Sequence, residues 1–275
     1  MYSGTTLTPM SGRIIGGHQK FDRVARHHLE KIAPRTAFPK SKRILHFEGR
    51  KGPDAIKRKS PAKDEPWHFY SPFDDDDSDI LELIRDHYDQ LVKQLKAGNE
   101  ERSAFEAAWL AHALVDGLTP AHHYPYEDKL KELRDGQEHD TRDSLRKKIV
   151  IGGDTKRDTI RKNWKAWGPK GLMSAHTLFE VGIATMIAPL GFKEATPTAH
   201  EIALAQEIGL TELFRRAARE IAILDMYDRF LKRGWTTKLI WQVRHKLAPT
   251  IIRTVTLAWY LALNDAKLIE PKHEA

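Results

Sequence analysis

Cysteine is absent from this sequence of 275 residues. Without thiols the chain can form no disulfide bond and can offer no thiolate to a metal ion. Any zinc ion would therefore be held by His, Asp and Glu side chains, and this donor set is more typical of catalytic than of structural zinc. Fourteen histidines are enough to supply such a site. The absence of cysteine does not indicate a reducing or an oxidising compartment, because a chain without cysteine tolerates both equally.

Long hydrophobic runs are also lacking. No window reaches the roughly 18 continuous apolar residues of a membrane span, so no transmembrane segment is predicted. Residues Met1 to Gly17 contain one basic residue, Arg13, and no apolar run long enough for a signal-peptide core, so the chain as written is expected to be cytoplasmic. The formal net charge of +7 favours an anionic partner or substrate, although a generally basic surface also explains it. No protein partner can be inferred.

Sustained strand alternation and internal repeats are missing too, and apolar residues recur instead at helical spacing. The chain is long enough to bury a substantial core, and we predict an all-α fold forming a single domain over residues 1–275. Thr198 and Glu201 form a capping box, and Gly209 is expected to interrupt the helix that it opens. The expected helices cover residues 19–33, 78–97, 101–116, 174 onwards, 198–209, 211–234 and 250–265, and residues 34–66 are expected to form a loop.

The segment of about residues 124–171 differs in composition from the rest of the chain and is predicted to form a polar, basic insertion in this domain. The segment holds thirteen Lys or Arg residues against nine Asp or Glu residues, and few apolar residues besides Trp164 and Trp167. Basic segments with aromatic residues can bind nucleic acid. A solvated flap with two packing tryptophans is the favoured interpretation.

The segment His112-Ala-Leu-Val-Asp-Gly-Leu-Thr-Pro-Ala-His122 carries the strongest chemical signal. His112 and Asp116 lie four residues apart at the end of an apolar helix, so both side chains leave the same face. Gly117 and Pro120 then end the helix and turn the chain back. After this turn His122 can point to the place where His112 and Asp116 converge, which gives three ligands of the kind that Zn²⁺ takes. The alternative is a salt bridge at the helix end followed by a solvated pair of histidines.

Other candidate ligands are scattered along the chain and are weak signals one by one. His68 lies between aromatic residues, and His176 and Glu180 repeat the spacing of four on a helix expected to be capped by Ser174. His139 and Asp143 share this spacing in a polar context, so they are interpreted as an ordinary surface pair. The remaining candidates are His18, which follows two glycines at a helix start, and Asp54, which follows Gly52-Pro53.

Taken in order, these motifs resemble the superfamily of zinc-dependent bacterial phospholipases C and fungal single-strand-specific nucleases. The family motif is His, three residues, Asp, and then a Gln-Pro-x-His ending. His112, Asp116, Pro120 and His122 fall in register with it, with Thr119 in place of the glutamine. The phospholipase His-Phe-Tyr is matched by residues 68–70. Asp54 lies fourteen residues before His68, and the same spacing separates the active-site aspartate of the phospholipases from this histidine. His176-Thr-Leu-Phe-Glu180 matches the His-x-x-aromatic-Glu pair, and His18 matches the histidine of the first helix.

The resemblance implies a multi-helix, phospholipase C-like fold that carries zinc and hydrolyses phosphodiesters. It places one zinc on His68, His112 and Asp116. A second zinc would be held by His122, His176 and Glu180, and the resemblance implies that Glu180 bridges to a third ion near His18 and Asp54. Clustered zinc lowers the pKa of a bound water toward roughly 7, and Asp54 is implied as the residue that orients or deprotonates the attacking water.

Two features depart from the family pattern. Thr5 occupies the place of the tryptophan whose free amino group binds the third zinc, and the insertion of residues 124–171 is longer than the family's link. The substrate therefore stays open between phospholipid and nucleic-acid phosphodiesters, with the His-Phe-Tyr and Glu180 details favouring phospholipid. A separate alternative is a non-catalytic, basic helical binding protein with a structural metal site.

Overall fold

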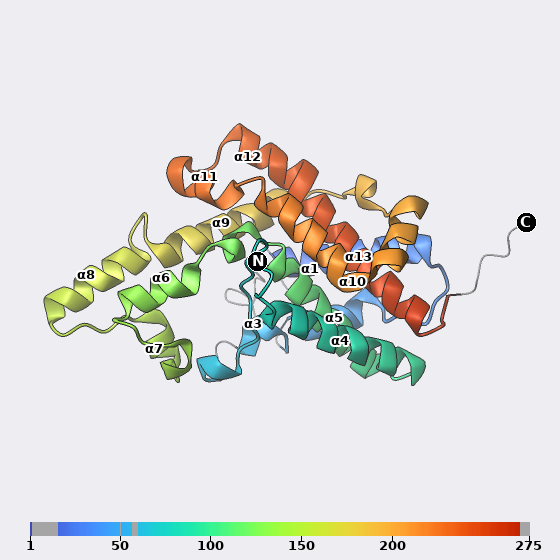
Figure 1. Ribbon diagram of the computed structural model, residues 1–275, viewed down its shortest axis with the longest axis horizontal. Helices are drawn as coiled ribbons and strands as arrows, with labels where there is room; N and C mark the ends of the chain where they lie inside the picture. The colour runs from blue at the N-terminus through green and yellow to red at the C-terminus, as the bar shows by residue number, and fades with distance from the viewer. Residues whose placement is uncertain (2–15, 50, 57–59, 270–275) are drawn as a thin grey trace, which may run out of the picture.

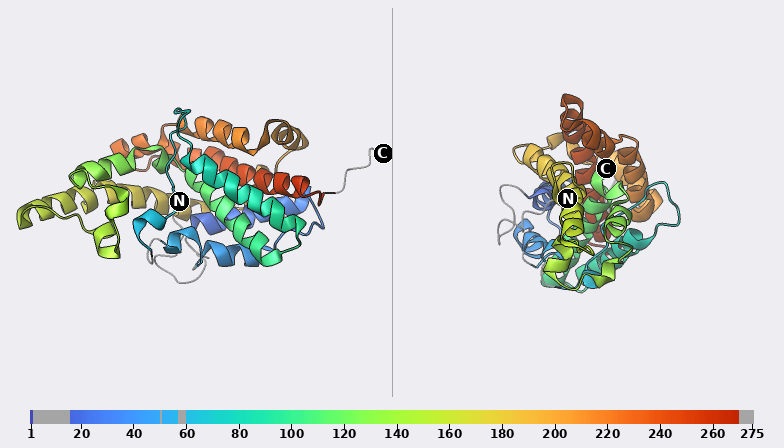
Figure 2. Two further views of the ribbon diagram at one scale, coloured as in Figure 1. Left: turned by 60° about the horizontal axis from the view of Figure 1, so that its bottom comes forward. Right: turned by 90° about the vertical axis from the view of Figure 1, so that its left-hand side faces the viewer.

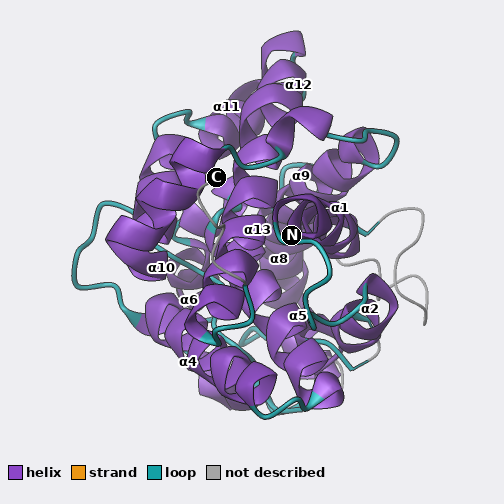
Figure 3. Cartoon of the chain, turned by 90° about the vertical axis from the view of Figure 1, so that its right-hand side faces the viewer, coloured by secondary structure: helices purple, strands orange, loops and turns teal. Residues whose placement is uncertain are grey.

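A computed structural model describes residues 1, 16–49, 51–56 and 60–269 of the chain (Figure 1). Helices supply all the regular structure of these residues and no strand occurs among them (Figure 3), which confirms the all-α prediction. The α-helices are α1 (Gly17–Ile32), α2 (Ser41–Glu48), α3 (Pro53–Ile56), α4 (Asp79–Lys96), α5 (Glu100–Gly117), α6 (Tyr126–Leu133), α7 (Leu145–Ile149), α8 (Lys156–Trp167), α9 (Leu172–Ile187), α10 (Ala199–Ala222), α11 (Met226–Arg233), α12 (Thr237–Gln242) and α13 (Ala248–Asp265). The other helical elements are the short 3₁₀-helices η1 (Ala62–Asp64), η2 (Pro120–His123), η3 (His139–Thr141) and η4 (Lys193–Ala195) and the π-helix η5 (Val243–Leu247).

The core is built around α5 and α13. Helix α5 packs against α1, α2, α4 and α13, and α13 also packs against α1 and α10. The fully buried Trp259 of α13 donates its indole N–H to the carbonyl oxygen of Ala107 in α5, at 3.1 Å. A buried helix held on all sides is a rigid support, so side chains at the end of α5 have well-defined positions.

Several predicted helix boundaries are confirmed. Helices α1, α4, α5 and α13 lie where the apolar periodicity placed them. The Thr198–Glu201 capping box opens α10, and Gly209 interrupts that helix with φ of 74°. A positive φ costs glycine little, which explains why the kink falls at this residue.

Three local predictions are wrong. Residues 34–66 are not a single loop, because they contain α2 and α3. The helix expected to reach Gly234 ends at Ala222, and the chain turns at Asp225 (φ 51°) before α11 begins. Ser174 does not cap α9 but lies inside it, where its hydroxyl donates to the carbonyl oxygen of Trp167 at 2.9 Å.

The insertion forms an arm that extends to one side of the helical bundle (Figures 1 and 2). Helices α6 and α8 and the segment after α7 form a small apolar cluster, made by Tyr126, Leu130, Ile151 and Ala166. The predicted packing of the two tryptophans is wrong, because Trp164 is largely exposed and Trp167 is only partly covered.

Among the described helices, none combines the length and the apolar character that crossing a membrane would require.

Candidate metal centre

The end of α5 positions the first two candidate ligands. His112 Nε2 lies 3.1 Å from Asp116 Oδ2 across one helical turn, and both side chains are buried. After Gly117 the Thr119 hydroxyl donates to the Val115 carbonyl oxygen at 2.7 Å, and the His122 N–H donates to the Thr119 carbonyl oxygen at 2.8 Å. These bonds turn the chain back, so His122 Nδ1 lies 3.5 Å from Asp116 Oδ1.

The segment before α4 brings His68 to the same carboxylate. The backbone N–H of Tyr70 donates to the His122 carbonyl oxygen at 3.1 Å, which ties this segment to η2. His68 Nδ1 then lies 2.6 Å from Asp116 Oδ2. As a result His68, His112 and Asp116 each place one ligand atom within 4.8 Å of the others.

Helix α9 supplies a second group on the other side of His122. Glu180 Oε1 lies 2.9 Å from His122 Nε2 and 3.2 Å from His176 Nε2, and the two imidazole rings stack with centroids 5.2 Å apart. Phe179, beside Glu180, is fully buried and stacks against Trp235, so α9 is held in a fixed rotation. His122, His176 and Glu180 meet the same 4.8 Å criterion.

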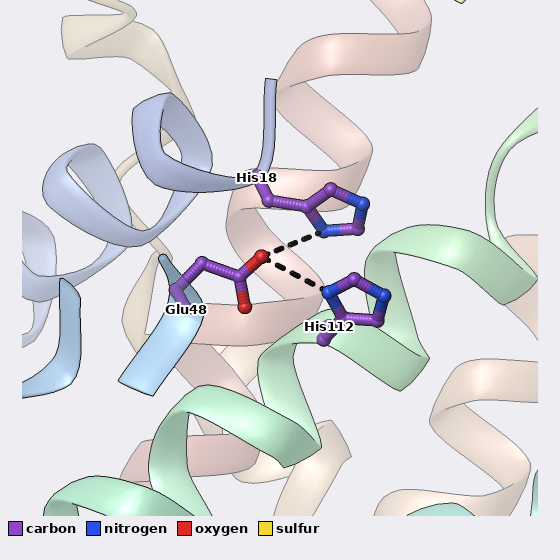
Figure 4. A group of neighbouring side chains, drawn as sticks. All are labelled: His18, Glu48 and His112. Atoms are coloured by element: carbon purple, nitrogen blue, oxygen red, sulfur yellow. Dashed lines mark hydrogen bonds and ion pairs between the residues drawn. The ribbon is translucent and has the colours of Figure 1, made fainter. Parts of the chain in front are cut away.

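A third group joins α1, α2 and α5 (Figure 4). The His18 ring stacks on the His112 ring with centroids 4.0 Å apart, and His18 Nε2 lies 3.2 Å from Asp116 Oδ1. Glu48 Oε1 lies 3.0 Å from His112 Nδ1 and 3.8 Å from His18 Nδ1. The residue that groups with His18 and His112 is therefore Glu48, whereas Asp54 Oδ1 lies 3.9 Å from His112 Nε2.

The sequence interpretation missed Glu48 because it assigned residues 34–66 to a loop. A signal was nevertheless present. Pro39 precedes a short run with apolar residues at Ile44 and Phe47, and Gly49 follows it. Proline before a helix and glycine after it are typical end signals, and they bracket the helix whose last residue is Glu48.

The amino group of Met1 also lies in this centre. It contacts the Asp116 carboxylate and is 3.1 Å from Glu180 Oε1. Thr5, which the sequence resemblance matched to the family's amino-terminal metal ligand, lies outside the described residues. An amino group thus joins the carboxylates of the two groups built on α5 and α9.

Burial and the packed charges shift the pKa values of the centre in opposite directions. Burial alone would raise the pKa of Asp116, but the Met1 amino group and the surrounding histidines hold it well below its usual range. Burial disfavours the charged form of His112, but Glu48 and Asp116 outweigh this effect and raise its pKa to about 10. Burial and the Met1 amino group lower the pKa of His122 to about 4. The Asp116 carboxylate is therefore ionised and needs positive charge beside it.

The centre opens into a cavity of about 580 Å³. Asp54, His68, His122, His176 and Glu180 lie on one wall. The arm also lines the cavity, through residues that include Leu145, Ile149 and Trp167. A small molecule in this cavity would therefore touch both the polar centre and the insertion.

The structure brings together all eight residues that the sequence singled out: His18, Asp54, His68, His112, Asp116, His122, His176 and Glu180. The interpretation of His139 and Asp143 as a surface pair is wrong. His139 lines the cavity, with Nε2 4.0 Å from Glu65 Oε2, whereas the exposed Asp143 accepts from Lys147 at 2.7 Å.

Comparison with known proteins adds no assignment: no family model matches the chain, and neither a curated protein nor a solved structure matches it.

Proposed function

We propose that this protein is a metal-dependent phosphodiester hydrolase with a phospholipase C-like helical fold and a zinc centre. One observation carries the proposal. Three groups of His and carboxylate ligands, two of them sharing His112, meet in one buried centre at the wall of a cavity. Chance surface clusters of acidic residues lack this burial and this share of imidazole.

The donor set fits zinc. Imidazole nitrogens and carboxylate oxygens are its usual ligands where thiolates are absent. Both ring nitrogens of His18 and Nε2 of His112 are buried near carboxylates without hydrogen-bond geometry to any described atom. Buried polar atoms are normally satisfied, so these nitrogens point to a ligand that the protein itself does not provide. His68, His112 and Asp116 would hold one ion, and His122, His176 and Glu180 a second.

Bound zinc would supply a water of lowered pKa and would neutralise charge on the phosphoryl oxygens. The protein's own groups do the rest. Glu48 accepts from His112 Nδ1 at 3.0 Å, which leaves Nε2 of that ring facing the centre. Asp54 lies on the cavity wall close to His112 and would orient the attacking water and accept its proton.

The cavity favours a phospholipid-type phosphodiester. Its arm-side wall carries apolar side chains, Leu145, Ile149 and Trp167, within the same cavity as the histidines. An apolar wall beside a polar centre suits a substrate with a charged head group and a hydrocarbon portion. A nuclease or nucleotidase of the same superfamily is the second candidate, and the basic character of the insertion favours it.

Metal content tests the proposal first. Protein purified without chelator should contain two or three equivalents of zinc by elemental analysis, and Asp116→Asn should lose most of it. His27→Ala is the matched control, because His27 is an exposed histidine on the same helix as His18. Zinc-free wild-type protein, or full zinc in Asp116→Asn, would overturn the proposed centre.

Activity then separates an enzyme from a structural metal site. Wild-type protein should hydrolyse a generic aryl phosphodiester, and Asp54→Asn should lower kcat by about 100-fold or more, as expected for loss of a general base. Its zinc content should be unchanged. Full activity in Asp54→Asn would remove that residue from the mechanism.

A further inference from the structure

An apolar stripe runs along the outer face of α8. Ile160, Trp164 and Trp167 lie at positions i, i+4 and i+7, so they project from one side of the helix. Their exposed fractions are 70%, 68% and 41%. The opposite side of α8 packs inward through Ala166, which is fully buried. Such a stripe normally faces a protein core, but here it faces away from the arm's own cluster.

This stripe continues into a second apolar surface at α7. Leu145, Ile149 and Val150 are exposed there. The Trp167 indole N–H donates to the Ile149 carbonyl oxygen at 2.8 Å, which joins the two surfaces. Leu145, Ile149 and Trp167 also line the cavity of the metal centre. The six exposed side chains, which we call the arm surface, therefore begin at the cavity and run outward along the arm.

Basic residues surround the arm surface. Between residues 156 and 170 one acidic residue, Asp158, stands against six basic ones: Lys156, Arg157, Arg161, Lys162, Lys165 and Lys170. Lys162 is buried and paired with Asp135 and Asp158, so it does not contribute to the outer face. Lys156 and Arg157 flank the stripe within one helical turn of Ile160, and both are exposed, as is Lys165. Apolar side chains flanked by Lys and Arg form the pattern by which amphipathic helices lie in the plane of an anionic bilayer.

We propose that the arm surface docks the protein onto anionic phospholipid bilayers. The tryptophans enter the headgroup region, the aliphatic side chains reach the acyl boundary, and the basic residues contact lipid phosphates. A nucleic-acid strand is the poorer partner. Bases stack on aromatic rings, but Leu145, Ile149, Val150 and Ile160 would gain no partner from a strand.

The inference rests on the proposed function in one respect: a lipid surface would carry the phosphodiester that the centre hydrolyses. Because the arm surface reaches the cavity, docking would bring lipid headgroups to the cavity that holds Asp54 and the histidines. Figures 1 and 2 show the arm clear of the main bundle, so the bundle does not cover its outer side.

Vesicle co-sedimentation of the full chain tests the docking. The variants are the Ile160→Ser/Trp164→Ala double mutant and a matched control, Ile223→Ser/Trp241→Ala. Ile223 lies just after α10 and is 71% exposed, and Trp241 lies in α12 and is 51% exposed. We expect binding to vesicles of phosphatidylcholine with added phosphatidylserine, and weaker binding to phosphatidylcholine alone. The arm variant should lower the partition coefficient by about tenfold or more, while the control matches wild type. Arg157→Glu/Lys165→Glu should weaken binding only to the anionic vesicles.

Equal binding by wild-type protein and the arm variant, or no binding to anionic vesicles, would overturn the proposal. Loss of single-stranded oligonucleotide binding in the arm variant, without any vesicle binding, would assign the surface to nucleic acid instead. The rate of hydrolysis of the soluble aryl phosphodiester is measured in a separate assay and should be unchanged in the arm variant. Vesicle binding without any hydrolysis would sink the proposed function and leave the docking surface in place.

Discussion

At the scale of single residues, Glu48 decides how His112 faces the centre. Its carboxylate accepts from His112 Nδ1 and is itself fully buried, so the imidazole is held in one orientation with Nδ1 protonated. Partners of this kind typically contribute 10–100-fold to metal affinity. We expect Glu48→Gln to weaken zinc binding by about that factor, measured by competition with a chromophoric chelator.

Glu106→Gln is the matched control for Glu48→Gln. Glu106 is an equally buried glutamate with its own imidazole partner, His87, at 2.7 Å, and lies in the half of α5 away from the centre. Its substitution should lower the free energy of unfolding but leave zinc affinity unchanged. Equal zinc affinity in wild type and Glu48→Gln would show that His112 needs no such partner.

The sequence could indicate most of the centre because its ligands sit in local patterns. The spacing of four in His112–Asp116 and in His176–Glu180 fixes each pair on one helix face, whatever the rest of the fold does. Glu48 has no such partner nearby in the chain. Its proximity to His112 arises from the packing of α2 on α5, which local spacing does not encode. His139 reaches the cavity wall for the same reason.

At the scale of helices, His28 connects α1 to the segment between α9 and α10. Its Nε2–H donates to the Phe192 carbonyl oxygen at 2.9 Å, and its Nδ1 accepts from the Thr196 hydroxyl at 2.7 Å. Protonation would remove the acceptor. Burial lowers the pKa of His28, although the bond to Phe192 partly offsets this effect.

Because the folded pKa of His28 lies below the unfolded value of about 6.5, the unfolded chain binds the proton more readily. The contribution of His28 to stability is therefore complete above pH 6.5 and is lost as the pH falls toward the folded pKa. We expect His28→Gln to cost about 1–3 kcal/mol at pH 7.5 and less at pH 5, measured by urea unfolding. The control is His27→Gln at the exposed neighbouring residue. Its effect on the free energy of unfolding should not become smaller between pH 7.5 and pH 5. A constant gap between wild type and His28→Gln at both pH values would contradict this assignment.

Gly117 controls the approach of two other helices. It is the last residue of α5, which confirms the prediction that the helix ends there. A Cβ atom at this position would lie 2.5 Å from the Phe214 ring and 3.0 Å from Ile80. We expect Gly117→Ala to destabilise the protein by about 1–3 kcal/mol through overpacking, measured by thermal and urea unfolding.

Gly98→Ala, where φ is 65° and no atom lies within 4 Å, provides the contrasting case of backbone strain without a clash. If Phe214→Leu fails to relieve the cost of Gly117→Ala, overpacking is not its cause.

Helix ends show which boundaries the sequence can predict and which it cannot. The capping box at Thr198 satisfies its bonds within four residues, so it was recognised correctly. The break before α11 depends on Asp225 adopting a positive φ, which aspartate tolerates but does not require. Ser174 illustrates the converse: a good capping residue bonds instead to the end of α8 because α8 and α9 are neighbours.

At the scale of the whole molecule, the sequence located the insertion but not its architecture. Its composition differs from that of the bundle, and in the structure four of its residues are buried in a small apolar cluster. The expectation that its tryptophans pack rested on the usual fate of large apolar side chains. That expectation fails at Trp164, because the arm has too few apolar residues to cover it.

Metal binding at the buried centre would be linked to the stability of the whole fold. Its ligands come from α1, α5, α9 and the segments around His68 and His122, so an ion held there would tie together elements that are far apart in sequence. A ligand that binds only the folded state stabilises it by RT ln(1 + [L]/Kd), which is about 4 kcal/mol at a thousandfold excess over Kd. For a chain of this length we expect chelation to lower Tm by about 10 °C.

Added zinc should restore Tm in proportion to the logarithm of its free concentration. Asp116→Asn and Glu180→Gln should lose this dependence, because each removes a carboxylate from the groups that would bind zinc. Asp89→Asn, an exposed aspartate on α4, should retain it. If neither chelator nor added zinc changes the melting temperature, the histidines and the Met1 amino group alone neutralise the buried carboxylates. The centre would then be a self-contained ion-pair network, and the hydrolase proposal would fail with it.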